Sequence, residues 1–219
     1  MIRHLLFDLD DTLYPTSAGM MQGISMRMNA FMIERVGIAP SDVERVRKDY
    51  WDRYGTTLRG LYIERHIDAQ AFLDYVHAVR VENYLQRDPR MIEMLAQLPQ
   101  AKYVFTNAPA DYARRVLATL GIEKYFERIF DINFIEYQSK PAPIAYAKVL
   151  AALGVPATEC LLVDDTTRNL IPARELGMKT VLVKGSPHGL SNDGADAVIE
   201  TIYELVEVVN RYTRIQVGK

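Results

Sequence analysis

Two clusters of acidic residues carry the strongest chemical signal in the sequence. Asp8-Leu9-Asp10-Asp11-Thr12 follows the apolar residues 4–7, and Asp164-Asp165 follows the apolar residues 160–163. Crowded carboxylates raise one another's pKa unless a cation neutralises them. Carboxylate oxygens without a matching set of His and Cys favour Mg²⁺ over zinc or copper. An acidic turn or helix cap explains one cluster alone, but two clusters at strand ends predict a shared metal.

Two further places offer groups that bind phosphate. Thr106-Asn107 follows the apolar residues 102–105, and it provides a hydroxyl, an amide and the backbone N–H groups of a helix start. Lys140, followed by Pro141, supplies a compact cation before another helix. The bland alternatives are a helix cap for Thr106-Asn107 and a solvated loop residue for Lys140.

The elements around these residues predict one parallel sheet. Four short apolar runs have the composition of buried strands, at residues 4–7, 102–105, 160–163 and 180–183. Amphipathic stretches that stop at a glycine lie between them, at residues 110–120, 143–153 and 170–176. Weaker runs at residues 128–132 and 197–199 add two strands, and a helix over 202–212 follows. The alternation predicts a doubly wound, Rossmann-like α/β fold, in which ligands bind at the carboxyl ends of the strands.

The stretch between residues 15 and 89 interrupts this alternation. It has no strand-like run and is rich in Met, Tyr, Arg and Glu at helical spacing, which predicts helices over 20–36, 40–54 and 69–76. A further helix over 89–98 returns the chain to the sheet. We therefore expect a core domain of residues 1–14 and 90–219 and an inserted α-helical cap domain of residues 15–89.

Composition narrows the class of protein. Of 219 residues 49% are hydrophobic and 25% charged, as in an ordinary globular protein. A formal net charge of −2 disfavours binding to a nucleic acid polymer, and no apolar run reaches the roughly 20 residues of a membrane span. The single cysteine, Cys160, fits a buried strand, so we expect a cytoplasmic protein without a disulfide. The four histidines lack zinc-site spacing, although His188, in the loop 185–189, offers one residue that could approach a substrate.

Taken in chain order, the motifs resemble those of the haloacid dehalogenase-like hydrolase superfamily. The matching residues are Asp8-Leu9-Asp10-Asp11-Thr12, Thr106, Lys140 and Asp164-Asp165. The inserted helices resemble that superfamily's cap of the first type, which lies over the site. The resemblance implies Mg²⁺ as cofactor, held by Asp8, the backbone carbonyl of Asp10, and Asp164. It places Asp165 in direct or indirect contact with the metal and makes Asn169 an outer anchor.

The resemblance also implies a reaction. Asp8 would attack phosphorus and form an aspartyl-phosphate, and Asp10 would protonate the leaving alkoxide and then deprotonate the attacking water. Thr106, Asn107 and Lys140 would bind the phosphate and neutralise its oxygens. Relatives that displace halide lack an acid at the position of Asp10, so this residue favours a phosphomonoesterase.

Three segments look like the branch of these phosphatases that includes pyrimidine 5'-nucleotidases. They are Leu13-Tyr14-Pro15-Thr16-Ser17-Ala18-Gly19, residues 54–61 and residues 163–169. A flat base and its ribose need aromatic or amphipathic walls, and we expect Tyr14, Tyr54 and Arg59 to provide them, with Met21 as a further candidate. Arg59 stands between residues typical of turns, including Gly60, which favours its facing a ligand. The predicted substrate is a small phosphorylated metabolite, with a nucleoside monophosphate as first choice.

Other functions remain open on the sequence. The same scaffold serves sugar-phosphate and phosphoglycolate phosphatases and phosphomutases, and Asp10 argues against a haloacid dehalogenase. A protein of another class, a non-catalytic phosphate-binding regulatory module, would keep the crevice without turnover. The apolar content of the cap permits either a monomer or a homodimer.

Overall fold

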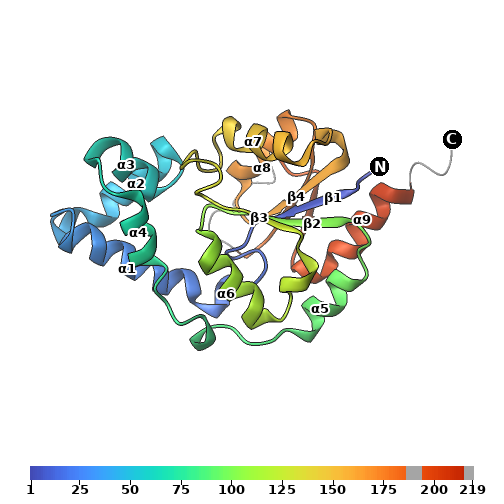
Figure 1. Ribbon diagram of the computed structural model, residues 1–219, viewed down its shortest axis with the longest axis horizontal. Helices are drawn as coiled ribbons and strands as arrows, with labels where there is room; N and C mark the ends of the chain where they lie inside the picture. Colours follow the sequence, from blue (N-terminus) through green and yellow to red (C-terminus); the bar gives the residue numbers. More distant parts are fainter. Residues whose placement is uncertain (186–193, 215–219) are drawn as a thin grey trace.

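The computed structural model describes residues 1–185 and 194–214. A parallel sheet lies at its centre (Figure 1), and six strands form it within the described residues. The strands lie in the order β3-β2-β1-β4-β5-β6, with every neighbouring pair parallel. Their bounds are β1 His4–Phe7, β2 Ala101–Phe105, β3 Arg128–Phe130, β4 Cys160–Asp164, β5 Lys179–Val183 and β6 Ala197–Ile199. The prediction of a doubly wound α/β fold is therefore confirmed.

Helices cover both faces of the sheet, which explains why its central strands are apolar throughout. Leu5 and Phe7 of β1 face a core formed with α5 (Pro89–Ala96), α6 (Ala110–Leu120) and α9 (Leu205–Arg214). Leu6 faces the opposite core, with α7 (Pro143–Leu153) and α8 (Thr167–Glu175). The buried Cys160 packs in this second core, as expected. Helix α8 begins three residues before the predicted start, so it includes Asn169.

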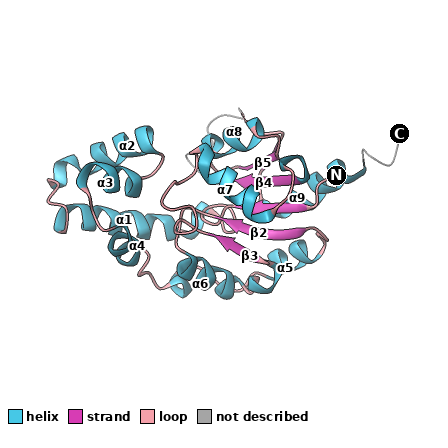
Figure 2. Cartoon of the chain, turned by 45° about the horizontal axis from the view of Figure 1, so that its top comes forward, coloured by secondary structure: helices cyan, strands magenta, loops and turns pink. Residues whose placement is uncertain are grey.

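Four helices form a separate layer beyond the carboxyl ends of the strands (Figures 1 and 2). They are α1 Met20–Glu34, α2 Val43–Tyr54, α3 Thr57–Arg65 and α4 Ala69–Val76. We call these helices the cap. They lie between β1 and β2 in the sequence, as predicted for the inserted domain, and the limits 15–89 of that domain stay a prediction.

Helix α3 was not predicted, because its start reads as a turn. Thr56 caps it, with its hydroxyl accepting the backbone N–H of Arg59 at 3.2 Å. Gly60, a weak helix former, lies inside α3 because Tyr50 of α2 packs directly on its backbone. The glycine that suggested a turn is therefore a point of close helix packing.

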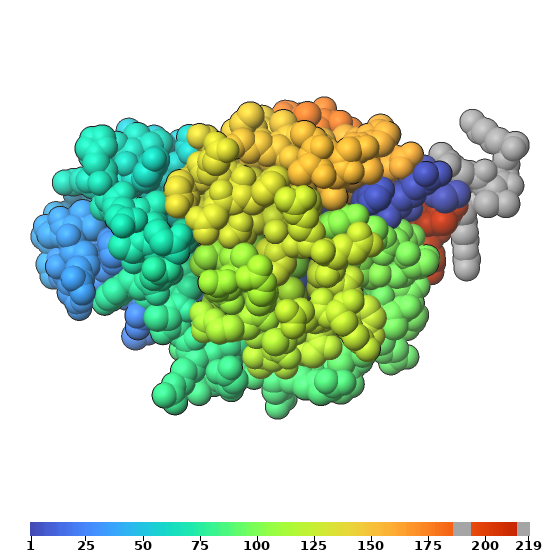
Figure 3. All heavy atoms as spheres, in the orientation of Figure 1, coloured from blue at the N-terminus to red at the C-terminus, as the bar shows by residue number. Residues whose placement is uncertain are grey.

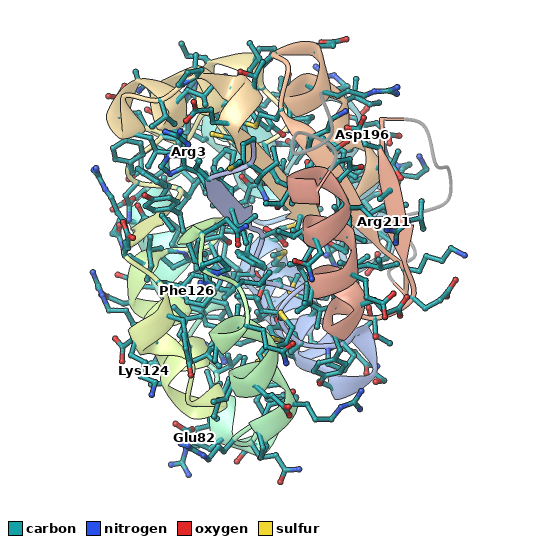
Figure 4. The ribbon with its side chains drawn as sticks, turned by 90° about the vertical axis from the view of Figure 1, so that its right-hand side faces the viewer. Arg3, Glu82, Lys124, Phe126, Asp196 and Arg211 are labelled. Atoms are coloured by element: carbon teal, nitrogen blue, oxygen red, sulfur yellow. The ribbon has the colours of Figure 1, made fainter. Side chains whose placement is uncertain are left out.

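The remaining described elements are short or lie far from the cap. The 3₁₀ helices are Thr16–Ala18, Pro40–Asp42, Val81–Asn83, Glu123–Tyr125, Ala157–Glu159 and Ile202–Glu204. Figure 4 looks at the end of the molecule opposite the cap, where Arg3 precedes β1 and Phe126 packs edge-on against Phe7 at 5.6 Å between ring centres. Within the described residues, no helix is both long and apolar enough to cross a membrane.

The cap contacts the core at the loop that carries Lys140. Gly55 has a φ of +90°, and an added Cβ would lie 2.8 Å from Cδ of Pro141. Beside it, the hydroxyls of Thr56 and Ser139 lie 3.3 Å apart. In Figure 3 the cap, in blue to teal, abuts the yellow part of the core. The fold thus holds the cap directly against the segment that positions Lys140.

Candidate active site

A buried lysine joins the two acid clusters. Asp8 directly follows β1, and its backbone N–H donates to the carbonyl of Val163 at 2.8 Å. The Nζ of Lys140 donates to Oδ1 of Asp8 and to Oδ2 of Asp164, both at 2.7 Å. Lys140 is 1% exposed and Asp164 fully buried. The predicted meeting of separate strand ends around one charged centre therefore occurs in the structure.

Burial and charge shift the ionisation of this centre in opposite directions. Burial raises the pKa of Asp8 well above its usual range, although the charge of Lys140 opposes this. Burial by itself would lower the pKa of Lys140, but Asp164 and Asp8 outweigh it and raise that pKa. The lysine therefore stays protonated, and any further positive charge would stabilise Asp8 in its ionised form.

The three carboxylates fit a hard divalent cation. Asp8, Asp164 and Asp165 each offer an oxygen, and these oxygens lie within 4.8 Å of one another. Three carboxylates face one lysine, so the cluster carries excess negative charge that a cation would offset. All-oxygen donors favour Mg²⁺ among the common protein metals. The side chain of Asp10 points to other partners, so any part it has at a metal falls to its backbone carbonyl.

Neighbouring polar groups fix the orientation of these carboxylates. The Nδ2 of Asn169 donates to both oxygens of Asp164, at 3.0 and 3.1 Å, and the backbone N–H of Thr166 donates to Oδ1 at 2.9 Å. The Thr12 hydroxyl lies 3.4 Å from an oxygen of Asp8 and 3.4 Å from one of Asp165. Asn169 therefore holds the carboxylate of Asp164, and its role as an outer anchor of a metal stays a prediction.

The Thr106-Asn107 segment meets the lysine at the tip of β2. The Thr106 hydroxyl accepts the backbone N–H of Ala108 at 3.0 Å. The Asn107 amide brackets the backbone of Lys140: its Oδ1 accepts the lysine N–H at 2.8 Å, and its Nδ2 donates to the lysine carbonyl at 3.1 Å. Asn107 thus positions the lysine loop, a contact that the sequence did not predict. Thr106 and Asn107 also line a cavity that lies under the cap.

Asp10 is held by two phenols. Tyr14 and Tyr112 both donate to Oδ1 of Asp10, at 2.5 and 2.8 Å. Desolvation raises the pKa of the Asp10 carboxyl, and the two hydroxyl donors partly oppose this. A carboxyl with a raised pKa can hold a proton closer to neutral pH, as an acid–base group requires.

A cavity of about 470 Å³ lies between the acids and the cap. Its floor includes Asp8, Asp10, Thr106 and Asp165, and most of its wall comes from α1 to α4. The cap side chains on this wall are largely apolar, and two arginines lie among them, Arg47 from the cap and Arg168 from α8. The apolar ones include Met21, Ile24, Met28, Trp51, Leu58 and Phe72. A volume of this size accommodates a small organic molecule.

The predicted substrate contacts lie elsewhere in the described structure. Tyr14 is 3% exposed and packs beneath Asp10 instead of on the cavity wall. Tyr54 donates to Glu64 on the cap surface at 2.7 Å, and Arg59 donates to the carbonyl of Tyr137 at 2.8 Å. None of the three lines the cavity, and each side chain is engaged with a protein partner. Met21, the additional candidate, does line it.

Several cavity residues were missed by sequence reasoning. Arg47 and Trp51 are four residues apart on α2, and this spacing on a predicted helix places them on one face. Arg168 stacks over the Trp51 ring at 4.2 Å and donates to the Trp51 carbonyl at 2.7 Å. The spacing was a usable signal, although which face would meet the core could not be known. The loop with His188 lies outside the described residues.

A second cavity of about 390 Å³ lies between α4 and α6. Its lining includes Asp74, Asp111 and Asp131, which bond to neighbouring protein groups, but neither Asp8 nor Asp164. His77 and Leu73 line both cavities. Asp8, Asp10 and Asp165 line the first cavity and not the second, so the first cavity is the candidate active site.

Comparison with known proteins identifies the family of the chain. Residues 2–177 match the family model described as haloacid dehalogenase-like hydrolase. The chain is 25% identical over 193 residues to phosphate metabolism protein 8 of Saccharomyces cerevisiae, covering 80% of this chain and 60% of that protein. It is 26% identical over 224 residues to a phosphoglycolate phosphatase of Yersinia pestis, covering 95% of this chain and 93% of that protein.

A solved structure shares the architecture. CbbY from Rhodobacter sphaeroides in complex with phosphate superimposes with a TM-score of 0.67 at 20% identity, over 94% of this chain and 96% of that one. Fold, buried acid–lysine centre and the family match over residues 2–177 all agree. The chain belongs to the haloacid dehalogenase-like hydrolases.

Proposed function

We propose that the protein is a Mg²⁺-dependent phosphomonoesterase that forms an aspartyl-phosphate on Asp8. The observation that carries the proposal is one arrangement of three groups. Asp8 pairs with Lys140 at a strand tip, and Asp10, two residues further on, lines the same cavity. A nucleophile and an acid–base group at one cavity are the two functions that this reaction needs.

In the first half of the reaction, an oxygen of Asp8 attacks phosphorus and the ester oxygen leaves with a proton from Asp10. In the second half, Asp10 takes a proton from water, whose oxygen attacks phosphorus and releases phosphate from Asp8. Lys140 and the Thr106 hydroxyl stabilise the phosphoryl oxygens. Asp8, Asp164 and Asp165 would hold Mg²⁺, which supplies charge neutralisation to carboxylates and phosphate alike.

Asp10 separates this function from its rivals. Displacement of halide needs no proton donor for the leaving group, whereas an alkoxide does. A non-catalytic phosphate-binding module needs neither a nucleophile nor an acid, yet both Asp8 and Asp10 line this cavity. A phosphomutase would have to exclude water from the aspartyl-phosphate and return the phosphoryl group to a bound sugar.

Two substrate classes have support. The name of the Yersinia pestis relative favours phosphoglycolate, and with it the small acid and sugar phosphates, as substrates. A nucleoside monophosphate is the second candidate, favoured by the aromatic side chains of Trp51 and Phe72 in a cavity of about 470 Å³. Phosphate esters of small acids and sugars come first, because a relative that covers nearly the whole chain carries that name.

The test is phosphate release by purified protein. With Mg²⁺ present, 2-phosphoglycolate, hexose phosphates, UMP and CMP are compared, and Asp8→Asn serves as the inactive reference. We expect steady phosphate release from at least one ester, abolished by a chelator and reduced at least about 10⁴-fold by the substitution. Halide release from a haloacid in the presence of chelator, or no turnover of any ester, would overturn the proposal.

A further inference from the structure

The two phenols on Asp10 form a buried hydroxyl cluster. Tyr14 is 3% exposed and Tyr112 is 1% exposed, and their hydroxyl oxygens lie 3.2 Å apart. Both donate to the same oxygen, Oδ1 of Asp10, although they are 98 residues apart: Tyr14 follows β1 and Tyr112 lies on α6. Tyr112 is therefore brought to the site by the fold alone.

This arrangement makes the two carboxylate oxygens of Asp10 unequal. Oδ1 accepts two hydroxyl hydrogens, which occupy its lone pairs. The hydrogen that Asp10 gives to a leaving group is therefore carried on Oδ2. We propose that Tyr14 and Tyr112 are positioning residues that fix the Asp10 carboxyl so that Oδ2 exchanges the proton with the ester oxygen.

The ring of Tyr112 is itself fixed from the cap side. The His77 ring packs on it at 4.8 Å between ring centres, where the chain leaves α4. Arg115, one turn after Tyr112, donates to the backbone carbonyls of His77 and Val79 at 2.6 and 2.7 Å. The segment that returns from the cap is thus tied to the helix that carries Tyr112, which keeps its hydroxyl in place.

The inference rests on the proposed function, because it assigns Asp10 a proton transfer to the ester oxygen. The two therefore need a test that separates them. Protonation matters for an alkoxide leaving group and far less for p-nitrophenolate, which leaves readily without a proton. A positioning role predicts a loss confined to alkyl esters, whereas a purely structural role predicts the same loss for both.

The experiment compares kcat and KM of the wild type, Tyr14→Phe, Tyr112→Phe, the double variant and Asp10→Asn. Each is assayed with p-nitrophenyl phosphate and with the best alkyl ester of the panel. We expect the double variant to lose between about 10- and 100-fold in kcat/KM on the alkyl ester and less than about 3-fold on p-nitrophenyl phosphate. The comparison uses kcat/KM because it reports the attack of Asp8 on the ester and not the later hydrolysis step that both esters share. Asp10→Asn should show the same selectivity with a larger loss.

Tyr203→Phe is the matched control, since it removes another phenol–carboxylate hydrogen bond, to Asp88 at 2.6 Å, away from the cavity. Thermal unfolding of every variant separates a loss of fold from a loss of chemistry. If the double variant does not fold, the same comparison is made with Tyr14→Phe and Tyr112→Phe. Equal losses in kcat/KM on both esters, or none, with Asp10→Asn still selective, would overturn the positioning role alone. If Asp10→Asn is itself unselective, the acid–base assignment fails and the inference fails with it.

Discussion

The floor and the wall of the active-site cavity are built on different principles. The floor includes carboxylates that follow strand tips, such as Asp8 and Asp165, and Asp8 is paired with the buried Lys140 at hydrogen-bonding distance. The wall consists of side chains from helix faces, such as Trp51 and Phe72, which contribute surface and shape. Parallel strands bring their ends together whatever the helices do, whereas the wall depends on how four helices pack. We therefore expect the sheet to set the chemistry and the cap to set the choice of substrate.

The largest expected effect comes from Lys140→Met, which removes the buried cation that pairs with Asp8 and Asp164. It leaves Asp8 and Asp164 buried without their cation, which costs about 3–5 kcal/mol of unfolding free energy. We also expect kcat to fall at least about 10³-fold. Urea unfolding and phosphate release measure the two effects. Lys148→Met is the control: it removes a surface pair with Glu136 at 2.7 Å, for which at most about 1 kcal/mol is expected, so an equal loss of stability would contradict the prediction.

His77, which follows α4 and lines the cavity, should make the free energy of unfolding depend on pH. Burial lowers the pKa of His77 from 6.5 to about 4. As pH decreases from 6.5 towards 4, the unfolded chain therefore binds a proton at His77 before the folded chain does. The contribution of His77 to the free energy of unfolding falls by about 3 kcal/mol over this range. Asp11 titrates over the same range with the opposite sign, since burial raises its pKa to about 6.

The comparison of wild type with His77→Phe isolates the histidine from Asp11. Unfolding free energies measured by urea between pH 4 and 7 should lose about 3 kcal/mol more in the wild type than in the variant over this range. His66→Gln, at an exposed helix end, is the control and should follow the wild type. Parallel curves for the wild type and His77→Phe would show that His77 does not carry the acid sensitivity.

Gly55→Ala tests whether the contact of the cap with Pro141 also keeps the neighbouring Lys140 in position. Gly55 and Gly37 both have positive φ, +90° and +78°, so alanine at either costs about 1–2 kcal/mol of stability. An added Cβ at Gly55 also meets Pro141 next to the lysine, whereas at Gly37 nothing lies within 4 Å. We expect kcat/KM to fall about ten-fold in Gly55→Ala and to stay near wild type in Gly37→Ala. Equal values of kcat/KM for the two variants would show that the contact between the cap and Pro141 does not affect Lys140.

The smallest effect should come from the wall itself. Trp51→Leu shortens a cavity side chain without touching the acids, so KM should rise about five-fold while kcat stays within about two-fold. Tyr62→Leu, an exposed cap aromatic outside the described cavity lining, is the control. A fall in kcat that equals the rise in KM would mean that Trp51 serves the chemistry as well as binding.

The same division explains what the sequence could predict. The strand ends carrying Asp8, Thr106 and Asp164 were located correctly, because short apolar runs fix where each strand stops. Trp51 and Arg47 were missed because helical spacing gives a shared face but not its neighbour. Arg59 was assigned to substrate because its surroundings read as a turn, whereas it lies on α3 and binds the backbone of Tyr137.

Tyr112 shows the limit in another form. Nothing near it in the sequence indicates a link with Asp10, which is 102 residues away. Helix α6 presents several buried side chains to the core, and an aromatic residue there predicts packing first. Its hydroxyl bond to Asp10 follows from the exact placement of α6 on the sheet, which local patterns do not encode.

The amide of Asn107 has a consequence for how the protein can change. By bonding both the N–H and the carbonyl of Lys140, it fastens the end of a connecting segment to the tip of β2. The position of the lysine backbone is then set by this anchor more than by the length of the segment that runs from β3 to Lys140. Because both hydrogen bonds are made to main-chain atoms of residue 140, a substitution of the lysine side chain leaves the anchor itself in place.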